Sequence, residues 1–160
     1  MSLEEALAVS MTVNGEPITA SVPVRQHLVD FLRTELGLTG SHIGCEHGIC
    51  GACSVRVDGA VVRGCLLLAV QADGCDVVTI EGLTESGEIA DLQANFVARN
   101  ALQCGYCTPG MLITAAELLK QGKPVSRDDI RTFLSGNYCR CTGYHAIVDA
   151  VEATLKARFA

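Results

Sequence analysis

The nine cysteines of this chain fall into two sets with metal-binding spacing, and one is left over. The first set has the spacing C-x4-C-x2-C and then a fourth cysteine; its members are Cys45, Cys50, Cys53 and Cys65. This is the plant-type arrangement of [2Fe–2S] ligands, in which four thiolates hold two iron ions. Glycine permits unusual φ angles and lets backbone N–H groups approach the sulfurs, and the loop contains Gly44, Gly48 and Gly51.

The second set combines a C-x2-C pair with a distant C-x-C pair; its members are Cys104, Cys107, Cys139 and Cys141. Each pair stands before an expected helix. Thr108 is predicted to cap the first of these helices, with Pro109 at its first helical position, and Thr142 to cap the second. Because helix N-termini carry partial positive charge, the two could converge on one anionic centre.

Zinc is the alternative occupant of both sets. The C-x4-C-x2-C spacing disfavours zinc for the first set, whereas the spacing of the second set suits zinc and an iron–sulfur cluster alike. A Rieske centre would need two histidine ligands, and none of the four histidines has that spacing: His27, His42, His47 and His145. We expect His47 to face solvent, and Cys75 fits neither set.

Composition restricts the partners and the compartment. With 49% hydrophobic and 19% charged residues among 160, the chain is predicted to fold. A net charge of -6 with only 12 Lys and Arg argues against nucleic acid and anionic membranes as partners. The acidic stretch from Met1 to Ala8 has no secretory features, and no segment approaches a membrane span, so we expect a cytoplasmic chain with cysteines that bind metal.

The first 82 residues predict a small α+β domain. Residues 8–13 and 18–22 form an expected hairpin that turns at Asn14-Gly15, and residues 54–58 and 61–63 form a second that turns at Asp58-Gly59. Between them, residues 24–36 have helical spacing, which Gly37 ends. A helical turn at 66–70 and a buried strand at 77–80 complete this half.

The remaining residues, 83–160, predict an all-helical domain. Apolar residues repeat with helical spacing in four segments joined by short loops: 90–101, 108–119, 126–134 and 144–158. Ser126 begins the third helix in a capping-box pattern with Asp129. Four short helices with short connections indicate a compact bundle, which gives domains of residues 1–82 and 83–160.

Three motifs together resemble a known family. They are Ile43-Gly-Cys-Glu-His-Gly-Ile-Cys-Gly-Ala-Cys53, Gln103-Cys-Gly-Tyr-Cys-Thr-Pro-Gly110 and Gly136-Asn-Tyr-Cys-Arg-Cys-Thr-Gly-Tyr144. In this order they resemble the small iron–sulfur subunit of molybdenum hydroxylases, the family of xanthine dehydrogenase, aldehyde oxidoreductase and aerobic carbon monoxide dehydrogenase. The resemblance covers nearly the whole chain and favours iron over zinc in the second set. His42 and Tyr138 depart from it, since many members have Lys and Leu or Ile there.

The resemblance implies a plant-ferredoxin-like β-grasp domain with one [2Fe–2S] cluster, followed by a four-helix bundle domain with a second. The implied ligands are Cys45, Cys50, Cys53 and Cys65 for the first and Cys104, Cys107, Cys139 and Cys141 for the second. Gln103 matches a glutamine that contacts the molybdopterin of a separate large subunit, and Cys141 matches the ligand nearest to it. A medium subunit with FAD completes the implied hetero-oligomer, such as a dimer of heterotrimers.

The predicted function is that of an electron-transfer subunit without a substrate site of its own. The resemblance implies electron flow from molybdopterin to the Cys104 cluster, then to the Cys45 cluster, then to FAD or another acceptor. A free-standing two-cluster ferredoxin is the rival, against which the helical half with Gln103 argues; a zinc-stabilised interaction module is a third. Because selectivity in this family belongs to the large subunit, the sequence predicts no substrate.

Overall fold

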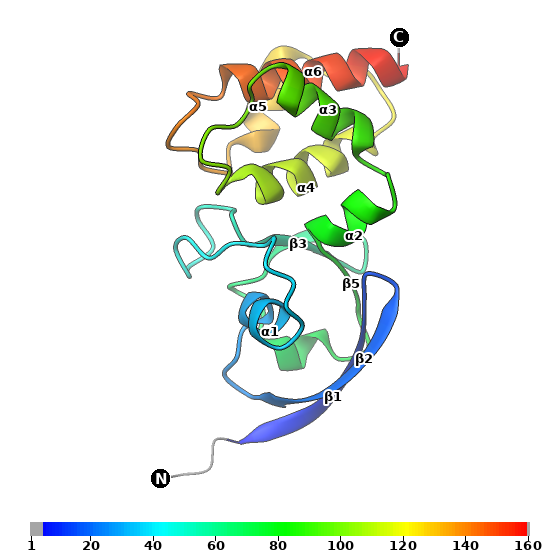
Figure 1. The fold of residues 1–160 in the computed structure, drawn as a ribbon, viewed down its shortest axis with the longest axis vertical. Coiled ribbons are helices and arrows are strands. Elements are labelled where there is room, and N and C mark those ends of the chain that lie inside the picture. The colour runs from blue at the N-terminus through cyan, green and yellow to red at the C-terminus, as the bar shows by residue number, and fades with distance from the viewer. Residues whose placement is uncertain (1–4, 160) are drawn as a thin grey trace.

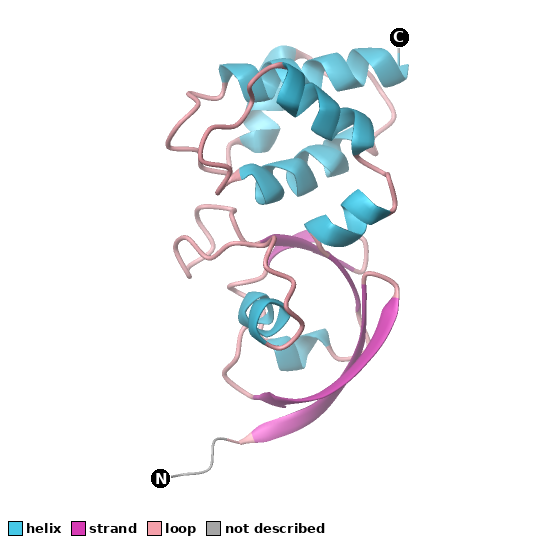
Figure 2. Cartoon of the chain, viewed as in Figure 1, coloured by secondary structure: helices cyan, strands magenta, loops and turns pink. Residues whose placement is uncertain are grey.

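The strands gather at one end of the molecule and most helices at the other, so that the first strand and the last helix lie at opposite ends (Figure 1 and Figure 2). The structure, a computed structural model, describes residues 5–159. The compartment prediction relied partly on Met1 to Glu4, which lie outside the described residues. Within residues 5–159, no helix is both long and apolar enough to cross a membrane.

The first hairpin forms where Asn-Gly predicted it. Strands β1 (Ala6–Val13) and β2 (Glu16–Pro23) pair antiparallel, with Val13 opposite Glu16. Asn14 and Gly15 have φ angles of 52° and 86°, as a type I′ turn requires. The second predicted hairpin also forms, from β3 (Ser54–Val57) and β4 (Ala60–Arg63).

The strands form one sheet in the order β2-β1-β5-β3-β4. Strand β5 (Asp76–Val78) lies in the centre, parallel to β1 and antiparallel to β3. The sheet curves around α1 (Leu28–Thr34), as Figure 1 shows. Apolar side chains between sheet and helix form the core of this half, including Val9, Met11, Phe31, Leu32 and Val77.

Three element boundaries in this half differ from the prediction. Helix α1 begins only at Leu28, because His27 forms a β-bridge with Leu68 and so belongs to an extended segment. The helix also ends earlier than predicted, at Thr34 with Glu35 as its C-cap, so the left-handed Gly37, at a φ of 68°, lies beyond the helix end. The helical turn expected at 66–70 is a 3-10 helix, η1, at Ala69–Ala72.

The strand expected at 77–80 ends at Val78, and a helix follows that the sequence did not predict. Thr79 donates its backbone N–H to Asn14 Oδ1 at 2.8 Å, which ends the strand, and α2 (Ile80–Glu85) begins at the next residue. Ile80 and Leu83 of this helix pack into the helical core.

The helical half contains α3 (Ala90–Ala98), α4 (Thr108–Leu119), α5 (Arg127–Leu134) and α6 (His145–Phe159). Helix α4 is buried along most of its length and lies between the sheet and the other helices (Figure 1). Ser126 caps α5 by accepting the Asp129 N–H, as predicted. The chain therefore has the predicted α+β class, with one five-stranded sheet and six α-helices in the described residues.

Candidate metal centres

The first cysteine set lies on the loop between α1 and β3 and at the end of β4. Cys53 and Cys65 are buried, whereas Cys45 and Cys50 are half-buried. The thiols interact as two pairs, Cys45 with Cys50 and Cys53 with Cys65, and Cys50 lies close enough to Cys53 to affect its charge. The structure thus brings together all four predicted residues of this set.

Backbone geometry around this loop leaves room for the sulfurs. The Cys50 N–H points to Cys45 Sγ at 3.4 Å. Gly44 has no positive φ angle; it is needed because a Cβ there would lie 3.0 Å from Cys50 Sγ. The left-handed positions are instead Glu46, Gly48 and Gly51. His47 is exposed, as expected.

The second set forms pairs across the two motifs and not within them. Cys141 Sγ lies 3.5 Å from Cys104 Sγ, and the Cys139 thiol lies close enough to the Cys107 thiol to raise its pKa. Each member of the C-x2-C motif is thereby matched with one member of the C-x-C motif. Among the described residues, no three His, Cys, Asp or Glu side chains surround a single-ion position.

The predicted caps of this set need two corrections. Cys107 is the N-cap residue of α4, so Thr108 is its first helical residue and Pro109 its second. Helix α6 begins at His145, three residues after Thr142, because Tyr144 has a left-handed φ of 69° that no helix can include. Thr142 instead donates its hydroxyl to Cys139 Sγ at 3.1 Å.

Burial and hydrogen bonds make the thiols chemically unequal. Burial alone would raise the pKa of Cys45, but backbone N–H groups of the loop, led by that of Cys50, lower it to about 6. Burial raises the pKa of Cys53 to about 12 and that of Cys107 also to about 12. Burial likewise acts on Cys139, yet the Thr142 hydroxyl and nearby N–H groups lower its pKa overall. Each site therefore contains one thiol with a lowered pKa and one with a pKa raised to about 12, Cys45 and Cys53 in the first site and Cys139 and Cys107 in the second.

Three consecutive residues join the two cysteine loops. Gly136 accepts a hydrogen bond from Arg63 Nη2 at 2.7 Å, and Tyr138 donates its N–H to the Cys50 carbonyl at 2.8 Å. Between them, Asn137 is buried and donates Nδ2–H to the Gly51 carbonyl at 3.1 Å. The sequence analysis did not predict this link. The one indication in the sequence is Asn137, a polar residue between the end of a helix and a cysteine motif.

A second link joins the loops at the surface. The His42 ring stacks on the Tyr106 ring with centroids 4.4 Å apart, and its Nδ1 lies 2.8 Å from the Tyr106 carbonyl oxygen. Since a carbonyl can only accept, His42 Nδ1 carries the proton. In the opposite direction, the Tyr106 hydroxyl donates to the Ile43 carbonyl at 2.7 Å. His42 therefore connects the first cysteine loop to the second through Tyr106.

Of the other residues singled out from the sequence, Gln103 lies beside the second centre and Cys75 lies away from both. Gln103 is exposed and donates Nε2–H to the Cys141 carbonyl at 3.0 Å, so its side chain is held against the second centre. Cys75 lies apart from both sets, next to Asp58 and Asp73.

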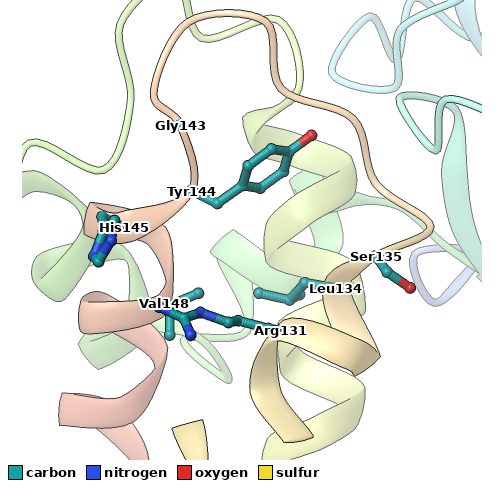
Figure 3. Close-up of a pocket in the computed structure, with 7 residues that line it drawn as sticks. All are labelled: Arg131, Leu134, Ser135, Gly143, Tyr144, His145 and Val148. Carbon is teal, nitrogen blue, oxygen red and sulfur yellow. The ribbon is translucent and has the colours of Figure 1, made fainter. Parts of the chain in front are cut away.

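A cavity of about 460 Å³ lies between α5 and α6, beside the second centre. Figure 3 shows Leu134 and Val148 at its floor and the Tyr144 ring across its upper side, with the hydroxyl directed away from His145. That hydroxyl accepts the Cys139 N–H at 2.9 Å. Tyr144 therefore separates the cavity from the cysteine motif.

Comparison with known proteins agrees with this geometry. Residues 11–77 match the family described as "2Fe-2S iron-sulfur cluster binding domain", and residues 79–152 match "[2Fe-2S] binding domain". The chain is thus a protein with two [2Fe–2S]-binding domains.

Relatives along the full length define the family further. The chain is 48% identical over 148 residues to caffeine dehydrogenase subunit gamma of Pseudomonas sp. (strain CBB1), covering 91% of this chain and 89% of that one. It is 46% identical over 150 residues to the nicotine 6-hydroxylase small subunit of Paenarthrobacter nicotinovorans, covering 94% and 90%. Among solved structures, quinoline 2-oxidoreductase from Pseudomonas putida 86 superposes with a TM-score of 0.87 at 46% identity, covering 97% of this chain and 99% of that one. The chain belongs to the small [2Fe–2S] iron–sulfur subunits of the molybdenum hydroxylase family.

Proposed function

We propose that this chain relays electrons through two [2Fe–2S] clusters, from a molybdopterin centre on a large subunit to FAD on a medium subunit or to another acceptor. One observation carries the proposal. The hydrogen bond from the Tyr138 N–H to the Cys50 carbonyl, 2.8 Å long, joins a proposed ligand of the first cluster to the neighbour of a ligand of the second. A direct hydrogen bond between the two cysteine loops keeps the two proposed clusters close together, as electron transfer from one to the other requires.

The proposed ligands are the four cysteines of each set, and their chemistry fits the group. Two thiolates on one tetrahedral metal ion lie about 3.8 Å apart when the metal–sulfur bonds are about 2.3 Å. The 3.5 Å separation of Cys104 and Cys141 is close to that value. We therefore propose that one iron takes Cys104 and Cys141, and the other Cys107 and Cys139. In the first site the corresponding pairs are Cys45 with Cys50 and Cys53 with Cys65.

When bound, each cluster supplies reversible one-electron oxidation and reduction. The chain's own residues hold the thiolates, exclude water from the buried ones and direct N–H groups at the sulfurs. Cys53 and Cys65 are buried, and Cys50 directs its N–H at Cys45. Such hydrogen bonds and burial set the potential of iron–sulfur centres.

The fold proposal follows the same division. We assign residues 1–82 to a plant-ferredoxin-like β-grasp domain and residues 83–160 to a four-helix bundle domain. The curved sheet around α1 supports the first assignment, and the shared core of α3 to α6 supports the second.

Exposed apolar side chains support contact with other subunits near both centres. Leu102 and Tyr138 are exposed beside the second centre, where Gln103 would face the molybdopterin of the large subunit. Ile49 and Leu66 are exposed on the first loop and beside Cys65, where we place the flavin subunit. Large exposed apolar residues in such positions are typical of protein interfaces. The proposed assembly is a hetero-oligomer, with a dimer of heterotrimers as its full form.

The substrate class of the complex belongs to the same proposal. Three relatives are named for caffeine, nicotine and quinoline, which are all N-heterocycles. An N-heterocycle is therefore the first class to test with the assembled complex.

Metal analysis tests the cluster assignment. We expect a red-brown protein with about four iron and four sulfide per chain, and two distinct EPR signals after reduction. Replacement of Cys75 by Ser should leave iron content unchanged, whereas Cys107→Ser should remove the second signal alone. A colourless protein with zinc in either site would refute the assignment.

Native mass tests the assembly. Purified from its source, the chain should co-migrate with a larger molybdenum protein. A single species near its own mass of 16.9 kDa with both clusters intact would support the free-standing ferredoxin instead.

A further inference from the structure

The two centres differ in one type of hydrogen bond. In the second centre, the Thr142 side chain donates to Cys139 Sγ at 3.1 Å, and the Thr142 backbone N–H points to the same sulfur at 3.4 Å. In the first centre, the Cys45 sulfur receives a backbone N–H from Cys50. Within residues 5–159, Cys139 is the one ligand cysteine whose sulfur accepts a hydrogen bond from a side-chain hydroxyl.

The surrounding loop fixes the direction of this hydroxyl. The Tyr144 N–H donates to Thr142 Oγ1 at 3.2 Å, so the oxygen is occupied as an acceptor and its proton is free for the sulfur. Tyr144 reaches this position through its left-handed φ of 69°, a conformation that costs a non-glycine residue free energy. The Tyr144 hydroxyl also accepts the Cys139 N–H at 2.9 Å. Three contacts between residues 139 and 144 thus orient one hydroxyl toward one sulfur.

We propose that the Thr142 hydroxyl sets the reduction potential of the second cluster through its hydrogen bond to Cys139 Sγ. Reduction adds negative charge that is shared by the ligand sulfurs, and a donor aimed at a sulfur stabilises the reduced form more than the oxidised one. The hydroxyl therefore raises the potential of the second centre relative to a site with backbone donors alone. Thr142 acts through Cys139 and is a tuning residue, with no contact to substrate. This inference rests on the proposed cluster assignment.

The test is a redox titration of the intact complex, followed by the EPR signal of each cluster. Thr142→Val keeps the shape of the side chain and removes the hydroxyl. At a fixed ambient potential, we expect the reduced-to-oxidised ratio of the second cluster to fall about tenfold, which is about 59 mV for a one-electron couple. The first cluster should titrate as in the unchanged protein.

A second pair of variants separates tuning from packing. Thr142→Ser and Thr142→Ala both lack the methyl group and differ only in the hydroxyl, so Ser should keep the original potential and Ala should shift it as Val does. Thr132→Val is the matched control, because its hydroxyl donates to the Asp128 carbonyl on α5. We expect this control to change neither potential.

The outcomes distinguish this inference from the cluster assignment. Iron content is measured first on every variant, and about four iron per chain supports the clusters whatever the potentials are. An unchanged second potential in Thr142→Val, an equal shift in both clusters, or a shift in Thr142→Ser as large as in Thr142→Ala would overturn the tuning role. Loss of iron from both Val and Ala variants, with iron retained in Ser, would also overturn it, because the hydroxyl would then hold the cluster and not tune it.

Discussion

Asn137 is the buried centre of the link between the two cysteine loops, and its replacement by Ala is the most direct test of that link. Its Nδ2 donates to the Gly51 carbonyl at 3.1 Å, and its Oδ1 accepts the Thr114 hydroxyl at 3.0 Å. The side chain therefore connects the first loop, α4 and the segment before Cys139. Removing it should loosen the spacing between the two centres without changing any of the eight cysteines.

The expected cost follows from what each partner keeps. The Gly51 carbonyl still accepts the Ser54 hydroxyl at 2.7 Å, and the Thr114 hydroxyl still reaches the Gly110 carbonyl at 2.9 Å. The single Thr114 proton is shared between Asn137 Oδ1 and the Gly110 carbonyl, so the loss is one full hydrogen bond and part of a second, each worth about 1 kcal/mol. No partner is left unsatisfied, so no further desolvation penalty is added. A total of about 1–2 kcal/mol corresponds to a decrease of about 2–8 °C in melting temperature for a chain of this size.

The assay combines thermal melting with EPR of the fully reduced protein, in which two nearby paramagnetic clusters broaden or split each other's signals. Asn95→Ala is the matched control. The Asn95 side chain also makes two partly buried hydrogen bonds, donating Nδ2–H to the Asp91 carbonyl at 3.1 Å and to Thr154 Oγ1 at 2.9 Å, but both lie within the helical half. Both variants should lower the melting temperature, and only Asn137→Ala should change the magnetic interaction. An identical interaction in Asn137→Ala and the unchanged protein, or an equal change in the control, would refute the reasoning.

Two further predictions concern the contact between the halves. Gly110→Ala should lower stability by about 1–3 kcal/mol and alter the magnetic interaction, because an added Cβ would collide with the Gly51 carbonyl oxygen; unaltered melting would contradict it. Glu88→Gln should lower stability at pH 7 by about 1 kcal/mol, since Glu88 pairs with the buried Arg56 at 2.9 Å but is itself partly exposed. The Arg56 hydrogen bond lowers the pKa of Glu88, so its contribution is present above the unfolded pKa of about 4.3 and is lost as the pH falls below it. The difference between variant and unchanged protein in melting temperature should therefore shrink below about pH 4, and a constant difference would contradict the assignment.

Elements with local signals were predictable from the sequence. The Asn14-Gly15 turn and the Ser126 cap each depend on a few neighbouring residues, and both formed as predicted. Elements whose ends depend on distant residues were not. Helix α1 is shortened by a bridge to Leu68, and β5 ends where Asn14 takes the Thr79 N–H; neither contact leaves a periodic pattern in the sequence.

The candidate centres show the same division. Spacing within each motif and the half of the chain in which it lies were enough to group the cysteines, and the structure brings each group together. Spacing could not reveal that Cys104 meets Cys141 and Cys107 meets Cys139, since that depends on how two segments more than thirty residues apart approach each other. The role of Thr142 was misassigned for a related reason. A Thr that follows a cysteine can either cap a helix or donate its hydroxyl to the cysteine sulfur. The left-handed backbone of Tyr144 delays the helix start, so Thr142 donates to Cys139 Sγ instead.

The residues before Cys139 explain why a single side-chain change there should not separate the two halves. Gly136, Asn137 and Tyr138 each bind the first half through a different partner: Arg63 on β4, the Gly51 carbonyl and the Cys50 carbonyl. Two of these bonds use the backbone of residues 136–138, which a side-chain substitution does not remove. An electron relay depends on a fixed distance between its two centres. Three hydrogen bonds from consecutive residues to three different residues of the first half prevent one half from shifting relative to the other. The loss of the Asn137 amide should therefore change the coupling between the clusters without separating the two halves.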